Sequence, residues 1–112
     1  MCMLARAIVS GGTVYVSGQL PVDSKTNEFV NGDITLQTKI VLENVKEILE
    51  AAGSSMDKVV KTTVLLTDIN EWPAMNEEYA KHFTKPYPAR VAYQVVNLPK
   101  GAKVEIDCIA TV

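Results

Sequence analysis

Histidine and cysteine are scarce in this sequence, and their scarcity removes several kinds of chemistry. The 112 residues include one histidine, His82, and two cysteines, Cys2 and Cys108. A zinc site needs three or four nitrogen or sulfur ligands, and the usual Ser–His and Cys–His nucleophile pairs need a histidine base. Two distant cysteines also argue against a disulfide framework and fit a reducing compartment. We therefore expect no metal and no cofactor, with any chemistry carried by carboxylates, arginine, tyrosine, lysine or backbone amides.

A charge excess and long apolar runs are also missing. The chain carries 11 basic and 13 acidic residues, a net charge of −2, and only 6% aromatic residues. This balance gives no electrostatic footprint for nucleic acid. No apolar run approaches the roughly 20 residues of a membrane-spanning helix, and the first residues lack the signal-peptide pattern. We expect one domain over 1–112 without nucleic-acid or membrane partners, cytoplasmic, or mitochondrial if a precursor segment is missing.

The residues that are present alternate between strand and helix patterns, in the order ββ(β)αβαββ. Runs rich in Val, Ile and Thr between Gly or Pro turns predict strands, and apolar residues at helical spacing predict helices. Asp33 fits the N-cap of the first helix, Gly53 its left-handed C-terminal residue, and Asn70 the cap of the second helix. The expected strands are 5–9, 13–17, a short 29–30, 59–67, 91–97 and 103–112, and the expected helices are 34–52 and 71–83.

The predicted strands are apolar on both faces. Segments 59–66 and 91–96 carry apolar residues at both odd and even positions. Two helices can cover only one face of such a sheet, so something else must cover the other face. A second copy of the chain is the simplest cover, and we expect a homo-oligomer packed through the sheet.

Arg90 is the most informative charged residue. It follows the rigid segment 86–89 (Pro-Tyr-Pro-Ala) and opens a predicted apolar strand, where a guanidinium is costly without a bidentate partner. One interpretation is an arginine that binds the carboxylate of a small acidic ligand. The other is a structural ion pair, for instance with Glu105. The residues alone leave both interpretations open.

Glu105 and Asp107 lie two residues apart in the last predicted strand and therefore share one sheet face. Such a pair can act as general acid and base or hold a hard metal ion, but it can equally be a solvent-facing polar edge. The segment 17–19 (Ser-Gly-Gln) ends a strand with a glycine, which either lets the backbone approach a ligand or only makes a turn.

Other conspicuous side chains have simpler interpretations. His82 lies at the end of the second predicted helix, where a cation complements the helix dipole. Cys108 is on the apolar face of its strand and is expected to fill the core. Trp72, Met75 and Tyr79 recur at helical spacing, which is typical of packing residues.

Several segments, taken in chain order, resemble the Rid family of reactive intermediate deaminases, also called the YjgF or L-PSP family. The resemblance covers almost the whole chain. It includes Val-Ser-Gly-Gln-Leu-Pro before the first helix and Pro-Ala-Arg before the penultimate strand. The segments that carry it are 16–21, 41–53, 59–64, 76–83, 88–90, 98–101 and 104–106.

The resemblance implies a single α+β domain of the chorismate-mutase-like, bacillus-type fold. Its mixed sheet would have five to six strands, with two helices packed on one face. Three copies would form a homotrimer with ligand clefts between subunits. The implied activity is a hydrolase of the 2-iminobutanoate/2-iminopropanoate deaminase type, which converts reactive 2-imino or enamine acids to 2-oxo acids and ammonia.

The resemblance also implies roles for individual residues. In such proteins the arginine that matches Arg90 grips the substrate carboxylate, and the glutamate that matches Glu105 holds or activates a water. The two implied catalytic residues are therefore Arg90 and Glu105. The implied substrate-binding residues are Arg90, Gly18, Ala92, Ser17 and Asn76.

Two positions depart from the family pattern. Leu4 stands where deaminating members usually carry a tyrosine, and Ala92 stands where they usually carry a cysteine. The cysteine position mainly lends its backbone amide, which Ala92 also has. The two departures, Leu4 and Ala92, favour an alternative, a non-catalytic module or sensor that binds small carboxylates in the same intersubunit cleft. A third hypothesis, a ribonuclease or translation inhibitor, is disfavoured by the negative charge and the single histidine.

Overall fold

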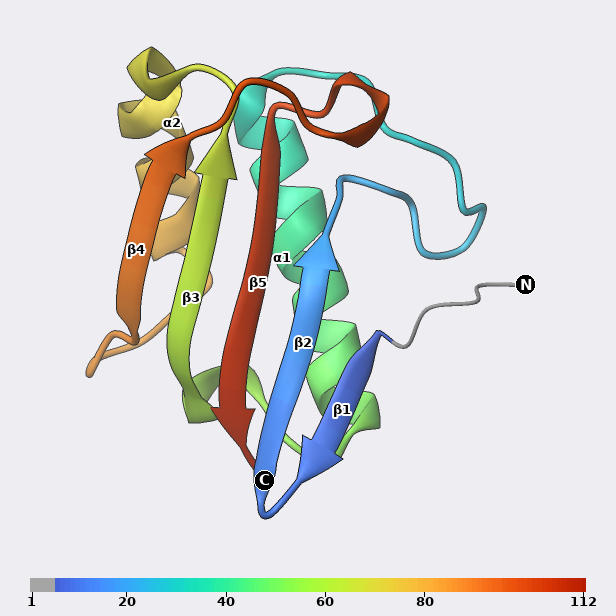
Figure 1. Ribbon diagram of the computed structural model, residues 1–112, viewed down its shortest axis with the longest axis vertical. Coiled ribbons are helices and arrows are strands. Elements are labelled where there is room, and N and C mark those ends of the chain that lie inside the picture. Colours follow the sequence, from blue (N-terminus) through green and yellow to red (C-terminus); the bar gives the residue numbers. More distant parts are fainter. Residues whose placement is uncertain (1–5) are drawn as a thin grey trace.

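The strands form one mixed five-stranded sheet in the order β1-β2-β5-β3-β4. A computed structural model describes residues 6–112, so Cys2 and Leu4 lie outside the described residues. Strands β3 and β4 are parallel, and all other neighbours are antiparallel (Figure 1). The elements are β1 (Ala7–Ser10), β2 (Thr13–Gln19), α1 (Ile34–Ala51), β3 (Val59–Leu66), α2 (Trp72–Ala80), β4 (Ala89–Gln94) and β5 (Val104–Thr111).

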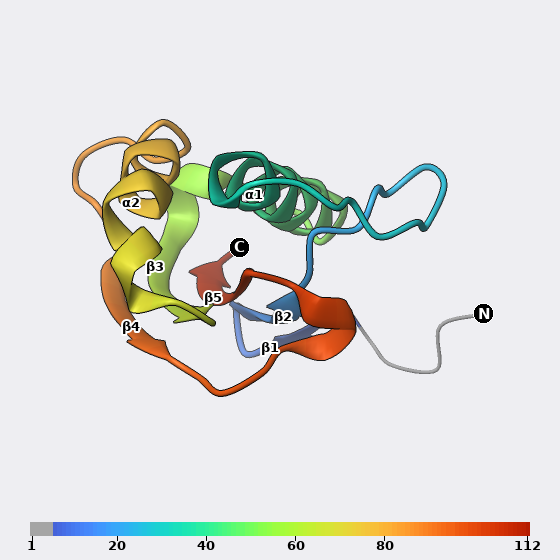
Figure 2. The ribbon, with the colours of Figure 1, turned by 90° about the horizontal axis from the view of Figure 1, so that it is seen from above.

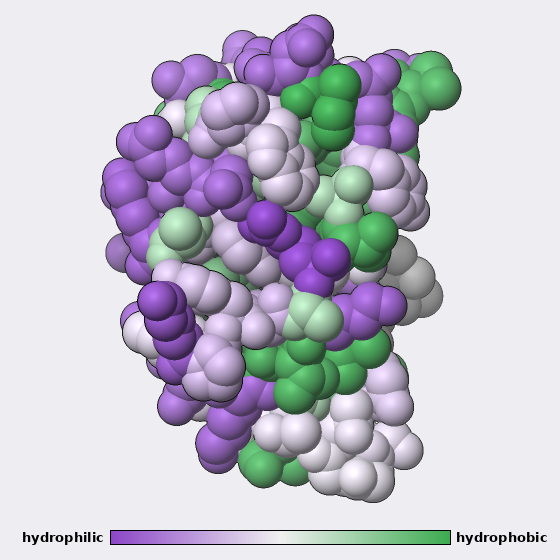
Figure 3. All heavy atoms as spheres, turned by 90° about the vertical axis from the view of Figure 1, so that its left-hand side faces the viewer, coloured by the Kyte–Doolittle hydropathy of each residue, from purple (hydrophilic) through white to green (hydrophobic). Residues whose placement is uncertain are grey.

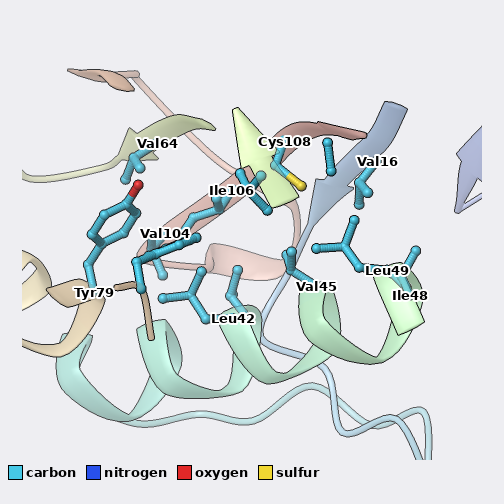
Figure 4. Close-up of a cluster of buried hydrophobic side chains, with 14 of the residues drawn as sticks. Val16, Leu42, Val45, Ile48, Leu49, Val64, Tyr79, Val104, Ile106 and Cys108 are labelled. Carbon is cyan, nitrogen blue, oxygen red and sulfur yellow. The ribbon is translucent and has the colours of Figure 1, made fainter. Parts of the chain in front are cut away.

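Both helices cover the same face of the sheet (Figure 2). Side chains of α1, among them Leu42, Val45 and Leu49, point toward Ile106 of β5 and form the core with it (Figure 4). Among residues 6–112, no α-helix lies on the other face of the sheet, which we call the helix-free face. The predicted α+β class, with a mixed sheet and two helices on one face, is therefore confirmed, while the homotrimer stays a prediction.

Helix α1 forms where the sequence predicts it, because both of its ends are specified locally. The Asp33 carboxylate accepts a hydrogen bond from the Leu36 amide at 2.9 Å, which satisfies one of the orphan donors of the first turn. After the helix, Gly53 has a φ of +84°, a left-handed conformation that glycine adopts at little cost.

The second helix differs from its prediction at both ends. A 3₁₀ turn, Ile69–Glu71, precedes α2, and the Asp68 carboxylate caps this turn by accepting from the Asn70 amide at 3.0 Å. The prediction that Asn70 caps α2 is therefore wrong, because Asn70 is a residue of the preceding turn. The helix itself ends at Ala80 instead of 83. The amides of Lys81 and His82 donate to the carbonyl groups three residues earlier, as in a 3₁₀ turn.

The strands also differ from prediction in detail. The expected strand 29–30 is reduced to one bridge between Val22 and Phe29. Strand β4 begins at Ala89, two residues earlier than expected, because its pairing with β3 extends to Lys61. Arg90 therefore lies inside a paired strand, opposite Thr62. In the part of the chain that the structure describes, no helix is long and apolar enough to cross a membrane.

The predicted core role of Cys108 is confirmed. Its side chain is 2% exposed, on the helix-covered face of β5, and burial together with the charge of Asp107 raises the pKa of the thiol to about 12. A thiol with so high a pKa is protonated at neutral pH and is not a nucleophile there.

Thr38 supplies a prediction about stability. Its side chain on α1 is fully buried, and its hydroxyl has no hydrogen-bond partner among the described residues. A buried, unpaired hydroxyl costs about 1–3 kcal/mol, and valine has nearly the same shape without the hydroxyl. We expect Thr38→Val to raise the free energy of unfolding by about 1 kcal/mol in denaturant titrations. Thr38→Ala, which opens a cavity as well, should not stabilise the chain.

Glu78 supplies a prediction about pH. This buried carboxylate on α2 has Oε2 2.7 Å from His82 Nε2 and Oε1 3.4 Å from Lys81 Nζ. Burial acts to raise the pKa of Glu78, but the hydrogen bonds from His82 and Lys81 outweigh it and lower the pKa below 4.5. A lowered pKa means that ionised Glu78 stabilises the fold at pH values above 4.5, and that this contribution is lost as the pH falls through the lowered value.

We therefore expect Glu78→Gln to cost about 1–3 kcal/mol of unfolding free energy at neutral pH. The difference from wild type should shrink in acid, below the ordinary carboxylate range. The matched control is Glu77→Gln, which changes the same group at an exposed position next in the chain. A Glu78→Gln penalty that is constant with pH would contradict the prediction.

Candidate functional site

The Arg90 side chain lies on the helix-covered face at the β4 edge of the sheet. Its Nη1 donates a hydrogen bond to Asn76 Oδ1 at 2.7 Å, and its Cζ lies 4.7 Å from the centre of the Trp72 ring and 4.6 Å from that of Tyr79. The side chain remains exposed to solvent. It borders a hollow of about 410 Å³ lined by Asn76, Tyr79, Ala80, Tyr87, Pro88 and Arg90.

Glu105 lies on the opposite, helix-free face. Along β5 the residues alternate between buried and half-buried, with Val104 and Ile106 in the core and Glu105 and Asp107 outside it. Glu105 is opposite Leu65 of β3, and Asp107 is opposite Thr63. Partial burial, and secondarily the charge of Asp107, raise the pKa of Glu105 above 4.5. A carboxylate with a raised pKa is the better proton acceptor.

Gly18 makes room for the Glu105 side chain. The pairing of β2 with β5 shifts register between Val16 and Gln19, so that 17–18 form an irregularity in the strand. A Cβ atom on Gly18 would contact Oε2 of Glu105 and lie only 2.8 Å from its Cδ. Within one chain the group that approaches Gly18 is therefore Glu105, and the approach of a ligand to this glycine stays a prediction.

The other predicted binding residues have structural contacts of their own. The Ser17 hydroxyl donates to the Arg6 carbonyl at 3.1 Å, and the Gln19 side-chain amide donates to the Ser17 carbonyl at 3.0 Å. Ala92 is half-buried on β4, opposite Val64, two residues beyond Arg90. Asn76 faces Arg90, as described above.

One chain does not bring Arg90 and Glu105 together. Their strands are separated by β3, and their partners on β3 are Thr62 and Leu65. Since strands lie about 4.8 Å apart and rise about 3.3 Å per residue, the two backbones are on the order of 14 Å apart. The side chains also point to opposite faces. Within 6–112, the ion pair between Arg90 and Glu105 that the sequence left open does not form.

Sequence reasoning missed two contacts of Arg90. Trp72 and Tyr79 were expected to be packing residues, and Tyr79 is indeed 5% exposed in the core, but both rings also stack on the guanidinium. The available signal was spacing, because Trp72, Asn76 and Tyr79 follow one another at i, i+4 and i+7 on one helix face. Among the described residues, no group of three or more His, Cys, Asp or Glu side chains is arranged to hold a metal ion.

The helix-free face exposes large apolar side chains. Ile8 is 56% exposed, Tyr15 48%, Val91 42% and Tyr93 50%. All four are on this face by strand register, since Ile8 pairs with Tyr15 while Val91 and Tyr93 pair with Thr63 and Leu65. Figure 3 shows the edge of the molecule formed by β4 and α2. Hydrophilic residues gather there on the helix side, and hydrophobic residues gather toward the helix-free face.

Comparison with known proteins identifies the class of protein that this fold represents. Residues 3–112 match the profile of the family described as "Endoribonuclease L-PSP". The chain therefore belongs to this family, which is also called the Rid or YjgF family, and the predicted resemblance is confirmed.

Individual relatives are similar over nearly the whole chain. The chain is 51% identical to a RutC family protein of Pyrococcus horikoshii over 95% of this chain and 84% of the relative. It is 44% identical to the human 2-iminobutanoate/2-iminopropanoate deaminase over 95% of this chain and 77% of that protein. Among solved structures, RidA of a Psychrobacter species has a TM-score of 0.94 at 44% identity, covering 99% of this chain and 89% of its own. Escherichia coli TdcF with bound serine has a TM-score of 0.91 at 38% identity, covering 100% and 90%.

Proposed function

We propose that this protein is a deaminase that hydrolyses 2-imino acids, such as 2-iminobutanoate and 2-iminopropanoate, to 2-oxo acids and ammonia. The observation that carries the proposal is the exposed Arg90 guanidinium, which is held in place by neutral groups and has no carboxylate partner among the described residues. A bidentate arginine suits the carboxylate that every such substrate has. Relatives of 44–46% identity named as deaminases support the same reaction.

The reaction requires little beyond orientation and proton transfer, because an imine carbon is already electrophilic. Water adds to this carbon, and Glu105 accepts the proton that the water releases. That proton passes to the imine nitrogen and gives a carbinolamine. A second proton, taken by Glu105 from the carbinolamine hydroxyl, then passes to the same nitrogen, and the C–N bond breaks to release ammonia as the carbonyl forms. The raised pKa of Glu105 favours this proton acceptance.

The site is completed by a second copy of the chain. Because Arg90 and Glu105 lie on opposite faces of one sheet, we infer that Arg90 of one copy meets Glu105 of its neighbour in a homotrimer. The exposed apolar residues on the same face as Glu105, such as Tyr15 and Tyr93, support burial of the helix-free face by another copy.

The activity can be tested by coupling. An amino-acid dehydratase or oxidase releases an imino acid, and the purified chain is added in increasing amounts. We expect the lag before 2-oxo acid and ammonia appear to shorten in proportion to the chain. An unchanged lag would refute the deaminase, and binding of 2-oxo acids without turnover would select the carboxylate-binding module.

A ribonuclease is the third candidate, and the description of the family names this activity. The net charge of −2 gives no excess of positive charge to attract a phosphate backbone. RNA cleavage that copurifies with the chain and disappears in Glu105→Gln would support it, whereas cleavage that persists in this variant would indicate a contaminant.

Gly18→Ala tests the link between the strand irregularity and Glu105. The added Cβ would meet the end of a flexible side chain, so Glu105 moves while the fold stays intact. We expect kcat to fall about 10- to 100-fold, since a displacement near 1 Å can cost this much, with the melting temperature nearly unchanged. Gly32→Ala is the matched control, because its Cβ would crowd only Leu36. Equal kcat in both variants would contradict the prediction.

A further inference from the structure

Three side chains of α2 surround the Arg90 guanidinium. Trp72 and Tyr79 stack on it at 4.7 and 4.6 Å, and Asn76 accepts its Nη1 hydrogen bond at 2.7 Å. The three are spaced so that they share one face of the helix. We refer to Trp72, Asn76 and Tyr79 together as the Arg90 clamp.

The clamp is attached to the sheet through a hydrogen bond between Tyr79 and β3. The Tyr79 hydroxyl and Thr62 Oγ1 lie 2.7 Å apart in a buried hydrogen bond, and Thr62 is the residue opposite Arg90 in the pairing of β3 with β4. Phe83, which follows the end of α2, packs against Tyr79 with 4.7 Å between the centres of the two rings. The ring that supports Arg90 is therefore fixed to the strand beside it.

All three members of the clamp are uncharged. A carboxylate at position 76 would orient the guanidinium equally well, but it would also neutralise the charge that attracts an anion. The amide of Asn76 uses only one of the five N–H donors of Arg90. Orientation is thus gained while the positive charge and the remaining donors stay available to a ligand on the side of the hollow.

We propose that Trp72, Asn76 and Tyr79 are positioning residues that hold Arg90 in the conformation that receives a substrate carboxylate. The proposal rests on the proposed function for the identity of the ligand. Its physical basis is preorganisation, because an arginine side chain that is already ordered loses less conformational freedom when it binds.

Trp72 tests the stacking. Trp72→Leu removes the aromatic face, and Trp72→Phe restores one. We expect calorimetry with 2-oxobutanoate to show about tenfold weaker binding for Trp72→Leu and binding within about threefold of wild type for Trp72→Phe. In the coupled assay KM should rise while kcat changes little. Met75→Leu, which changes a fully buried side chain of α2 outside the clamp, is the control and should leave binding within about threefold.

Asn76 tests the requirement for a neutral partner. Asn76→Asp should pair with Arg90, so that the melting temperature stays the same or rises while 2-oxobutanoate binds about tenfold or more weakly. Asn76→Ala should weaken binding less than Asn76→Asp does. A purely structural role predicts the reverse order, since alanine loses the hydrogen bond that aspartate keeps.

NMR of the Arg90 Nε–Hε group separates the clamp from the proposed function. We expect an ordered signal in the free wild-type chain and a mobile one in Trp72→Leu. Binding within twofold of wild type in both Trp72→Leu and Asn76→Asp would overturn the proposal. If the wild-type chain binds no 2-oxo acid, the proposed function fails, and an Arg90 signal equally mobile in wild type and Trp72→Leu would then overturn the clamp as well.

Discussion

Replacing Arg90 by alanine is expected to lower kcat/KM for imino-acid hydrolysis by about 10²–10⁴-fold. Two charge-assisted hydrogen bonds to a carboxylate contribute about 1.5–3 kcal/mol each, and alanine removes both. The loss should appear largely in KM, since the carboxylate is present in the ground state as well as in the transition state. Steady-state kinetics over a range of substrate supply rates, with release of the 2-oxo acid as the readout, measures both constants.

The fold should tolerate the change, because Arg90 is exposed and its contacts are all to α2. Arg90→Lys keeps a positive charge but loses the planar fork, so its activity should lie between those of wild type and Arg90→Ala. Lys39→Ala removes an exposed cation from α1 and serves as the control for net charge. Full activity in Arg90→Ala would refute the carboxylate grip and, with it, the proposed chemistry.

The importance of Arg90 could be argued from sequence, but its partner could not. A guanidinium after a rigid proline segment, at an apolar strand, predicts a need for a specific partner. The two expected partners were a ligand carboxylate and Glu105, yet the amide of Asn76 accepts the hydrogen bond of Arg90 and two aromatic rings stack on its guanidinium. This contact depends on how α2 lies over the β4 edge, which is a tertiary feature with no local signature.

The other predictions also divide into those that depend on local sequence and those that depend on tertiary structure. The alternation that puts Glu105 and Asp107 outside the core is a property of one strand, and the burial of β5 follows it. That Arg90 points to the opposite face depends on strand order and on the parallel pairing of β3 with β4. The cap of α1 was predictable because Asp33 acts on its own helix, whereas Asn70 was assigned to a helix that starts later.

Glu105→Gln is expected to lower kcat about 10²–10⁴-fold with little change in KM, which is the range for losing a general base. Glutamine keeps the size of the side chain but cannot take a proton from water. The variant should be at least as stable as wild type, because the raised pKa shows that the fold disfavours the charged form of Glu105. Thermal unfolding checks this, and it separates a loss of chemistry from a loss of structure.

The pH profile provides an independent test of the role of Glu105. A base must be ionised to act, so the rate should fall as the pH falls through the raised pKa of Glu105. Asp107→Asn removes one of the two causes of the raised value, and the acid limb should move to lower pH. If the acid limb of the pH–rate profile does not move in Asp107→Asn, the group that titrates is not Glu105.

Mixing the two inactive variants tests where the site is assembled. If Arg90 of one copy works with Glu105 of its neighbour, a homotrimer formed from equal amounts of Arg90→Ala and Glu105→Gln chains contains some interfaces with both residues intact. Random assembly places both intact residues at about a quarter of the interfaces. We therefore expect up to about a quarter of wild-type activity after co-refolding. If Arg90 and Glu105 acted within a single chain, no site in the mixture would hold both residues and no activity would return.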